Sequence, residues 1–276
     1  MDNTKKDTGW FKGIAVCLML GCLAAGSSAE LSICLFVLAA GFDFYGQSKE
    51  NENLTALISK SIFSIYIRYW PVLAIAFLTA FVLKKPLAEH FVADSLYCFL
   101  GLRFTFCAQW RFLPAFVLVL ASAPMLLKIC ERENALVSVD ALLLALFSVF
   151  TYFFLPKIMN TGLFSALNAS VLWQGLYTAL ELLPVFAVGF LLAKNGVRLN
   201  RKKDTGFLAG LSRGLGYIGD AWLSIWLISS LSCEMLGKAF FPPRFSAVIF
   251  VLLLAVSTLG AKLLEGAERK ILRWLR

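Results

Sequence analysis

Ionisable side chains inside apolar stretches are the residues of this 276-residue chain best placed to do chemistry. A charge costs about 2.5–3.5 kcal/mol to insert into a bilayer and usually faces a protein interior or an aqueous cavity. Four residues fit this description: Asp43, Arg68, Asp140 and Glu181. Arg68 lies deepest, about two helical turns inside its stretch, and Asp43 is a candidate partner for it. The other two lie near the ends of their stretches, where a carboxylate can reach water.

Nucleophilic and acid–base catalysis have few candidates in this sequence. The only histidine, His90, lies in a loop between two apolar stretches, so no serine or cysteine within a stretch has an imidazole nearby to activate it. There is no Gly-rich phosphate loop, no His-Glu-x-x-His motif and no paired-carboxylate motif. The seven cysteines include no Cys-x-x-Cys pair, so no metal site is expected. Cys98 and Cys107 are interpreted as small buried residues in preference to a disulfide.

The elements that must position these residues are membrane helices. Hydrophobic residues make up 59% of the chain and charged residues 16%, a balance that excludes an ordinary soluble domain. A bilayer core of about 30 Å needs about 20 apolar residues per helix, and no alternating pattern suggests membrane strands. We therefore expect one all-α, polytopic helix bundle that covers residues 1–276. Its eight expected spans are Gly13–Gly26, Leu31–Tyr45, Ile62–Leu83, Phe112–Ile129, Leu136–Leu155, Leu176–Ala193, Gly216–Leu236 and Phe245–Leu263.

Basic residues set the expected orientation. With both termini in the cytoplasm, most of the 26 lysines and arginines fall on the cytoplasmic side, as the positive-inside rule requires. The net charge of +9 is then a topology signal, and nucleic acid is not an expected partner. Lys5 and Lys6 before a short apolar run resemble the start of a secretory signal, but a second apolar run follows directly. We therefore expect the first span to be retained.

Three segments around the spans carry further expectations. Phe91–Phe106 is apolar yet contains charges, which predicts a re-entrant or surface-lying segment. Lys262–Arg276 mixes apolar and charged residues, and we expect it to form an interfacial helix along the lipid headgroups. Gly206, Gly210 and Gly214 recur every four residues, a spacing that allows close helix packing.

Five short motifs follow one another along the chain. They are Lys12–Leu20, Phe36–Leu38 followed by Gly41-Phe42, Ile65-Tyr66 with Trp70, Trp110–Leu113 leading to Pro124, and Ile225–Ile228. In order and spacing they resemble the acyltransferase-3 family of bacterial integral-membrane O-acyltransferases. The resemblance implies a plasma-membrane protein that takes an acyl group from cytoplasmic acyl-CoA, such as acetyl-CoA, and places it on an envelope glycan or lipid.

The chain departs from that family where catalysis and donor binding are expected. The family's first-helix histidine corresponds to Cys22, and its later histidine falls at Ser229. Its donor-binding arginines fall near Ser61 and Ser64. A general base typically contributes about 10²–10⁴-fold in rate, so Cys22 is left as the candidate catalytic nucleophile. The resemblance and the buried charges together imply a donor or substrate pocket formed by Asp43, Tyr66, Arg68, Trp70, Trp110, Arg111, Trp226 and Ser229.

Three functions remain open for such a chain, because a fold alone does not fix a function. The first is a diverged acyltransferase, with impaired catalysis of its own, that modifies an envelope glycan through Cys22 or through a partner's residues. The second is a non-catalytic relative that binds membrane lipid or glycan, or acts as a scaffold for another membrane protein. The third is a small solute transporter lined by Asp43 and Arg68. No resident cofactor is expected, and acyl-CoA is the donor if the chain is active.

Overall fold

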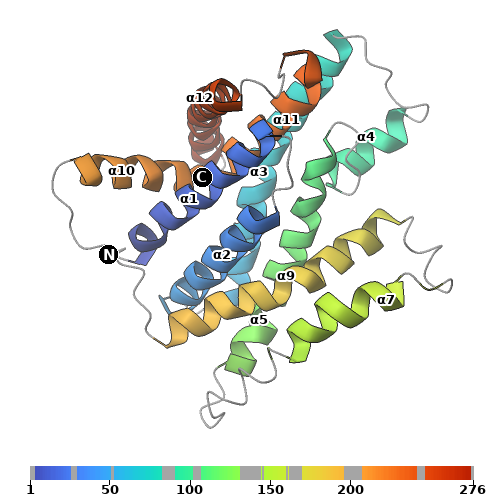
Figure 1. The fold of residues 1–276 in the computed structure, drawn as a ribbon, viewed down its shortest axis with the longest axis vertical. Coiled ribbons are helices and arrows are strands. Elements are labelled where there is room, and N and C mark those ends of the chain that lie inside the picture. Colours follow the sequence, from blue (N-terminus) through green and yellow to red (C-terminus); the bar gives the residue numbers. More distant parts are fainter. Residues whose placement is uncertain are drawn as a thin grey trace.

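The computed structural model describes residues 4–25, 30–50, 53–82, 91–101, 107–130, 144, 146–159, 161, 170–195, 207–240 and 246–274. Every regular element in these ranges is a helix (Figure 1), which confirms the all-α class. Six helices are long and apolar enough to cross a membrane, so the chain is an integral membrane protein. They are α1 (Thr4–Ala25), α2 (Glu30–Glu50), α3 (Leu54–Val82), α5 (Phe112–Cys130), α9 (Val171–Lys194) and α12 (Ser246–Trp274).

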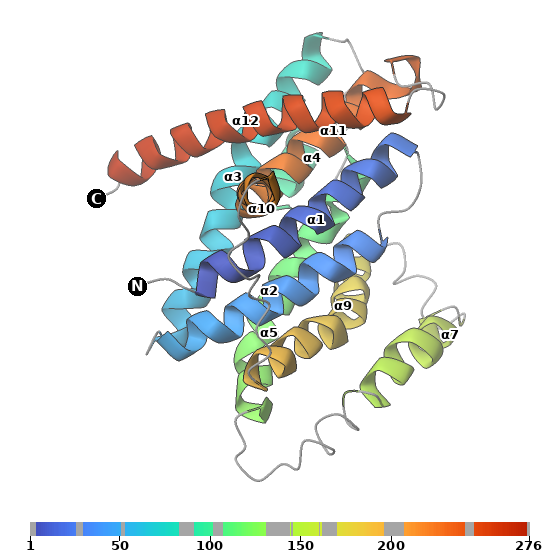
Figure 2. The ribbon, with the colours of Figure 1, turned by 60° about the vertical axis from the view of Figure 1, so that its left-hand side comes forward.

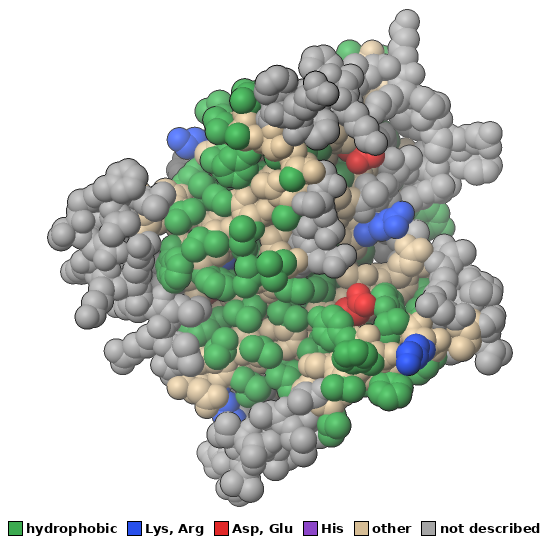
Figure 3. Space-filling view, in the orientation of Figure 1, with side chains coloured by type: hydrophobic (Ala, Val, Ile, Leu, Met, Phe, Trp, Pro, Cys, Tyr) green, Lys and Arg blue, Asp and Glu red, His purple; other side chains and the backbone are tan. Residues whose placement is uncertain are grey.

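The outer surface has the character of a lipid-facing one. Bulky apolar side chains stand out from several helices, among them Phe81 (74% exposed), Phe153 (66%) and Leu263 (77%). Figure 3 shows hydrophobic side chains over much of the described surface on one face, with few charged ones between them. Soluble monomers seldom expose apolar patches of this extent. In a bilayer the same side chains contact acyl chains at no cost.

The helices form a row with further helices packed behind it. α1, α2 and α9 lie side by side in that order (Figures 1 and 2). α3, α5 and α11 (Trp222–Phe240) pack behind this row, and α12 lies against α11 and α1. α1 begins, α2 ends and α3 begins at the same end of the molecule, at the lower left of Figure 2, which we call the N-terminal end of the bundle.

The C-terminal tail differs from the expected separate interfacial helix. α12 runs without a break to Trp274, so the charged tail continues the last apolar span (Figure 2). Near the start of that tail, the Lys262 Nζ lies 5.6 Å from the centre of the Tyr217 ring, which belongs to α10 (Phe207–Asp220). A lysine at this distance from an aromatic face is attracted by the ring quadrupole. The tail is thereby tied to the bundle as well as to α12.

Six of the eight expected spans coincide with the six apolar helices. About half of the expected span Leu136–Leu155 lies outside the described residues, and residues 146–155 belong to a shorter apolar helix, Leu146–Met159, which ends in α7 (Leu155–Met159). The expected span Gly216–Leu236 is divided between α10 and α11, which meet at Ala221. α11 is helical but is not among the six candidate spans. The number eight therefore stays a prediction.

α11 is enclosed by its neighbours along most of its length. From Ala221 to Leu231 nearly every side chain is buried, and α1, α3 and α12 pack against it. The hydroxyls of Ser229 and Ser230 donate to the carbonyl of Trp226 one turn earlier, at 3.0 and 2.6 Å. Hydrogen bonds of this kind within a helix allow serine to be buried without an unpaired hydroxyl. α11 is therefore a central helix in which Ser229 and Ser230 are satisfied locally, whereas the buried hydroxyl of Ser224 has no hydrogen-bond partner among the described residues.

Glycines bring α1 and α10 into backbone contact. A Cβ built on Gly13 would lie 2.9 Å from the Cα of Leu215, and one built on Gly219 would lie 2.8 Å from the backbone nitrogen of Gly13. Real Cβ atoms do not approach other atoms so closely, so only glycine fits at either position. Small residues at a crossing let two helix backbones approach and gain dispersion energy along their length.

The expected glycine contact lies elsewhere on α10. Gly210 and Gly214 have nothing within 4 Å of where a Cβ would stand, so they do not mediate packing among the described residues. Gly206 lies outside the described residues. The contact uses Gly219 instead, and a Cβ built on Gly9 of α1 would lie 3.4 Å from the Cα of Gly216, whose own Cβ position is open. A four-residue spacing shows that glycines share one face of a helix. It does not show whether that face packs against a neighbouring helix.

A second glycine crossing joins α2 to α9. A Cβ on Gly41 would lie 3.0 Å from the carbonyl carbon of Phe186, and one on Gly189 would lie 2.9 Å from the backbone nitrogen of Phe42. The two glycines thus face each other's helix reciprocally. The two crossings thus fix α1 against α10 and α2 against α9. The position of α2 in the row depends on the second of them.

Three aromatic side chains of α3 hold the end of the short helix α4 (Phe91–Phe99). The hydroxyl of Tyr69 donates to the carbonyl of Cys98 at 2.7 Å, and the indole N–H of Trp70 donates to Phe99 at 3.1 Å. The hydroxyl of Tyr66 donates to Leu100 at 3.0 Å. The last carbonyls of a helix have no partner within it, so the donors of Tyr66 and Trp70 satisfy groups that lipid would leave unpaired. The Cys98 carbonyl also accepts from the backbone N–H of Gly101, at 3.0 Å.

The same contacts favour the re-entrant alternative for this segment. Tyr66 and Trp70 stand about 18–24 Å along α3 from its first residue, by the rise of 1.5 Å per residue. The end of α4 is therefore held near mid-length of α3 rather than beside one of its ends.

Replacing Tyr69 by phenylalanine is expected to loosen α4, because the buried Cys98 carbonyl then keeps only the backbone N–H of Gly101 as a donor, at 3.0 Å. Loss of one hydrogen bond costs about 0.5–1.5 kcal/mol. Cys98 is 2% exposed. We expect its alkylation rate, measured by mass spectrometry on membranes, to rise about tenfold, which corresponds to about 1.4 kcal/mol. Tyr97→Phe removes a hydroxyl from an exposed residue of α4 and serves as the control. Equal protection of Cys98 in both variants would contradict the anchoring role.

Candidate functional site

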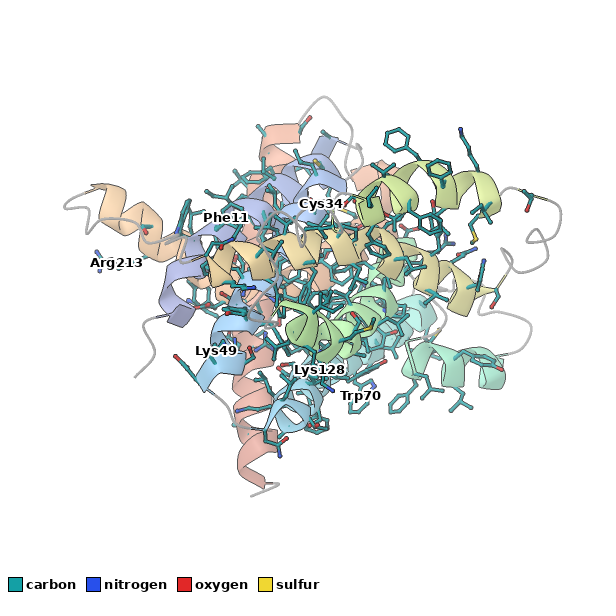
Figure 4. The ribbon with its side chains drawn as sticks, turned by 90° about the horizontal axis from the view of Figure 1, so that it is seen from below. Phe11, Cys34, Lys49, Trp70, Lys128 and Arg213 are labelled. Atoms are coloured by element: carbon teal, nitrogen blue, oxygen red, sulfur yellow. The ribbon has the colours of Figure 1, made fainter. Side chains whose placement is uncertain are left out.

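A cavity of about 530 Å³ opens at the N-terminal end of the bundle. Its wall is built by α1, α2, α3, α5 and α11, so residues far apart in the sequence meet there. The volume lies within the range of about 300–1,000 Å³ typical of ligand sites. Figure 4 views the bundle from below and labels Lys49 and Lys128, which stand in the last turns of α2 and α5.

One face of α2 supplies both a polar and an apolar part of the wall. Asp43, Gln47 and Glu50 line the cavity towards the end of the helix, and Phe36 and Phe44 line it further inside. Successive members of this set are separated by intervals that place them on one side of an α-helix. The wall therefore changes from polar to apolar along a single helix.

One face of α3 supplies the opposite wall. Its lining residues include Lys60, Ser61, Ser64 and Arg68, again at helical intervals. Asn53 caps the N-terminus of the helix: its Oδ1 accepts a hydrogen bond from the backbone N–H of Ala56 at 3.0 Å. This N-cap satisfies one of the free N–H groups of the first turn. Because of it, α3 extends eight residues before the expected span, and Lys60 and Ser61 are carried on the same rigid helix as Arg68.

The inner end of the cavity is apolar. Phe116 and Leu120 of α5 and Trp222 and Leu223 of α11 line it, together with Phe36 of α2. The Phe116 ring packs edge-on against Trp222, with ring centres 5.7 Å apart. An apolar end with a polar, charged entrance suits a ligand that has both parts.

The charges of the wall leave a positive balance. Asp43 accepts hydrogen bonds from both Lys12 and Thr8, and its side chain and that of Lys12 are 8% and 16% exposed. This pair is neutral as a unit. Among the described residues of the wall, Lys60 and Arg68 then face a single further carboxylate, Glu50. The entrance therefore favours an anion.

The structure gives the expected partners Asp43 and Arg68 different roles. Both line the cavity, but Asp43 forms its ion pair with Lys12 instead of Arg68. Trp226 lines a second, much smaller cavity. Cys22 is partly buried on α1 and lines neither of these two cavities.

Four other candidate residues make structural contacts. The Trp110 indole donates to the Ser230 hydroxyl at 2.9 Å, and Ser229 bonds its own helix. Tyr66 and Trp70 hold α4, as described above. Arg111, which follows Trp110 in the short 3-10 turn Ala108–Arg111, is exposed. None of these five lines the large cavity.

Of the other residues considered from the sequence, Glu181 is partly buried on α9 and does not line the large cavity. His90 and Asp140 lie outside the described residues. Cys98 and Cys107 are buried and are not joined in a disulfide, as the buried-residue interpretation predicts. In the described part of the chain, no group of three or more His, Cys, Asp or Glu side chains could hold a metal ion.

Sequence reasoning missed several residues of the cavity, notably Lys12, Lys60 and Trp222. The two lysines carry the same signal as any basic residue near a helix end, and they were assigned to topology. Lys60 could have been found from the polar residues that precede Arg68 on one face of α3, at helical intervals. Nothing in the local sequence of Trp222 indicates that it faces a cavity.

Comparison with known proteins adds no relative. No family model matches the chain, and no curated protein and no solved structure is found to be similar to it.

Proposed function

We propose that this protein holds an acyl-CoA in the large cavity and takes part in the acylation of an envelope glycan or lipid, as a diverged, acyltransferase-3-like protein of the bacterial plasma membrane. The observation that carries the proposal is the cavity itself, with Lys60 and Arg68 at a polar entrance and aromatic side chains at its inner end. A guanidinium group suits bidentate capture of phosphate oxygens, and the apolar end suits an acyl group. Ser61 and Ser64, at the positions where the acyltransferase-3 family has arginines, line the same wall.

The position of the entrance supports a cytoplasmic ligand. Lys49, Lys128 and Lys194 stand in the last turns of α2, α5 and α9, three helices that end towards the N-terminal end of the bundle (Figures 1 and 2). Lysines in the last turn also interact favourably with the helix dipole. By the positive-inside rule this end faces the cytoplasm, where acyl-CoA is found. The expected cytoplasmic termini and eight spans are part of the proposal.

A non-catalytic role for the same cavity is supported by the chemistry of its inner end. Phe36, Phe116 and Trp222 cannot accept a proton or a transferred acyl group. In that role the chain would hold the donor or a membrane lipid for a membrane-protein partner that supplies the catalytic base. The enzyme and the non-catalytic protein would both bind the acyl-CoA, but only the enzyme would transfer the acyl group.

Binding of acetyl-CoA to the purified full chain in lipid nanodiscs tests the proposal. Arg68→Ala is expected to weaken binding about 10- to 100-fold, the range for loss of a charge-assisted hydrogen bond, and Lys60→Ala to weaken it less. Arg111→Ala, which removes an exposed charge outside the cavity, is the matched control. Affinity should also fall as salt is raised. Absence of binding to the unmodified chain, or equal binding by the Arg68→Ala/Lys60→Ala double variant, would refute the proposal.

Transfer of labelled acetyl from acetyl-CoA in membranes then separates the two roles. An active enzyme incorporates label into glycan or lipid and loses it in Cys22→Ser if that thiol carries the acyl group. A binding subunit retains acetyl-CoA without incorporation. Either result is compatible with binding in the cavity.

A further inference from the structure

Two cavities meet at one pair of aromatic rings. Phe36 of α2 and Trp222, the first residue of α11, line both the large cavity and a small cavity of about 20 Å³. Their ring centres are 3.6 Å apart and their planes are inclined by 32°. No other residue lines both cavities among those described. The pair is therefore the wall between them.

The small cavity lies deeper in the bundle and is almost entirely apolar. Phe112 and Trp226 line it, with Ala15, Val16 and Met19 of α1. Its volume would accommodate about one water molecule, but apolar cavities of this kind stay dry. It would instead accept methylene groups if the wall were removed.

The length of the apolar part of the large cavity can be judged along α2. Asp43, at the polar part of the wall, and Phe36, at its inner end, are separated by seven residues, which corresponds to about 10 Å along the helix. A lipid acyl chain that reaches the bilayer midplane needs about 15 Å, half of the 30 Å core. The large cavity as a whole extends to Glu50, about 21 Å from Phe36 along α2, but its apolar part is too short for a full-length chain while its inner end stays closed.

We infer that Phe36 and Trp222 form a stop that restricts the cavity to acyl groups shorter than those of membrane lipids. This inference rests on the proposed function, because it names the substrate class of the same cavity. The two residues do not take part in transfer; they determine specificity by closing the path into the small cavity. Trp226 stands one helical turn beyond Trp222 on α11, so opening the stop lengthens the path by about 6 Å.

Binding of a series of acyl-CoAs, from acetyl to palmitoyl, to the full chain in nanodiscs tests the inference. For the unmodified chain, affinity should stop rising once the acyl group reaches the stop. Trp222→Ala and Phe36→Ala should each move that limit to longer chains, with affinity rising about fourfold for each further buried methylene. Phe190→Leu removes buried aromatic volume outside both cavities and should leave the limit in place.

The outcomes distinguish the two proposals. Failure of every acyl-CoA to bind the unmodified chain overturns the proposed function. Binding with an unchanged length limit in both alanine variants overturns the stop alone. Where an alanine variant does not yield folded protein, Trp222→Phe and Phe36→Leu are measured instead, and the same unchanged limit would count against the stop.

Discussion

Gly13→Leu is expected to abolish recovery of folded protein. The new Cβ alone would lie 2.9 Å from the Cα of Leu215, so the α1 and α10 backbones must separate. Overpacking of a core usually costs about 1–3 kcal/mol when side chains can yield. Backbone atoms cannot yield, so we expect a loss above about 3 kcal/mol, enough to unfold a marginally stable protein. Size-exclusion chromatography of the detergent-solubilised protein, with its thermal midpoint, measures the effect.

The matched control is Gly214→Leu on α10. That position is exposed and has nothing within 4 Å of a Cβ, so leucine there replaces a helix-weakening glycine without a clash. We expect an unchanged or slightly raised thermal midpoint. Normal yield and midpoint for Gly13→Leu would show that α1 and α10 do not cross as described. Gly41→Leu tests the α2–α9 crossing in the same way, through Phe186.

Asp43→Leu is expected to destabilise the protein by about 3 kcal/mol or more, because it leaves the Lys12 ammonium without its carboxylate. The two side chains are 8% and 16% exposed, so little solvent is available to replace the lost partner. Thr8 also loses the acceptor of its hydroxyl. Reversible unfolding in mixed detergent micelles measures the free energy of unfolding of each variant.

The double variant Lys12→Met/Asp43→Leu separates loss of the pair from loss of one partner. Replacing a buried ion pair by apolar residues is often close to neutral, so we expect the double variant to recover most of the stability that Asp43→Leu loses. A coupling energy near zero in this double-mutant cycle would contradict the ion pair. Binding of acetyl-CoA is a second readout, since Asp43 and Lys12 both line the cavity.

The sequence predicts most of the fold because the length of an apolar stretch carries most of the information about a membrane helix. It misplaces the boundary near Gly216 for a specific reason. Backbone hydrogen bonds continue across the junction of α10 and α11, from Ala221 to Tyr217 at 3.1 Å and from Ile225 to Ala221 at 3.0 Å. Gly219 and Asp220 stand directly before the junction, and they are a local signal that the expected span Gly216–Leu236 passed over.

The candidate site was predictable only in part. Asp43 and Arg68 were found because charges inside apolar stretches are rare, and both line the cavity. Tyr66 and Trp70 attracted attention through a motif, yet their polar atoms satisfy the carbonyls of α4. Which lysine reaches Asp43 depends on how α1 and α2 cross, and a pattern within one helix does not contain that information.

The composition of α11 has a consequence for biogenesis. Its polar residues include Ser224, Ser229, Ser230, Ser232 and Glu234. A segment with this many polar groups partitions weakly into lipid when it leaves the ribosome alone. In the finished bundle α1, α3 and α12 surround it, and of these only α12 is synthesised afterwards. We therefore expect integration of α11 to depend on helices made long before it and to be completed when α12 emerges.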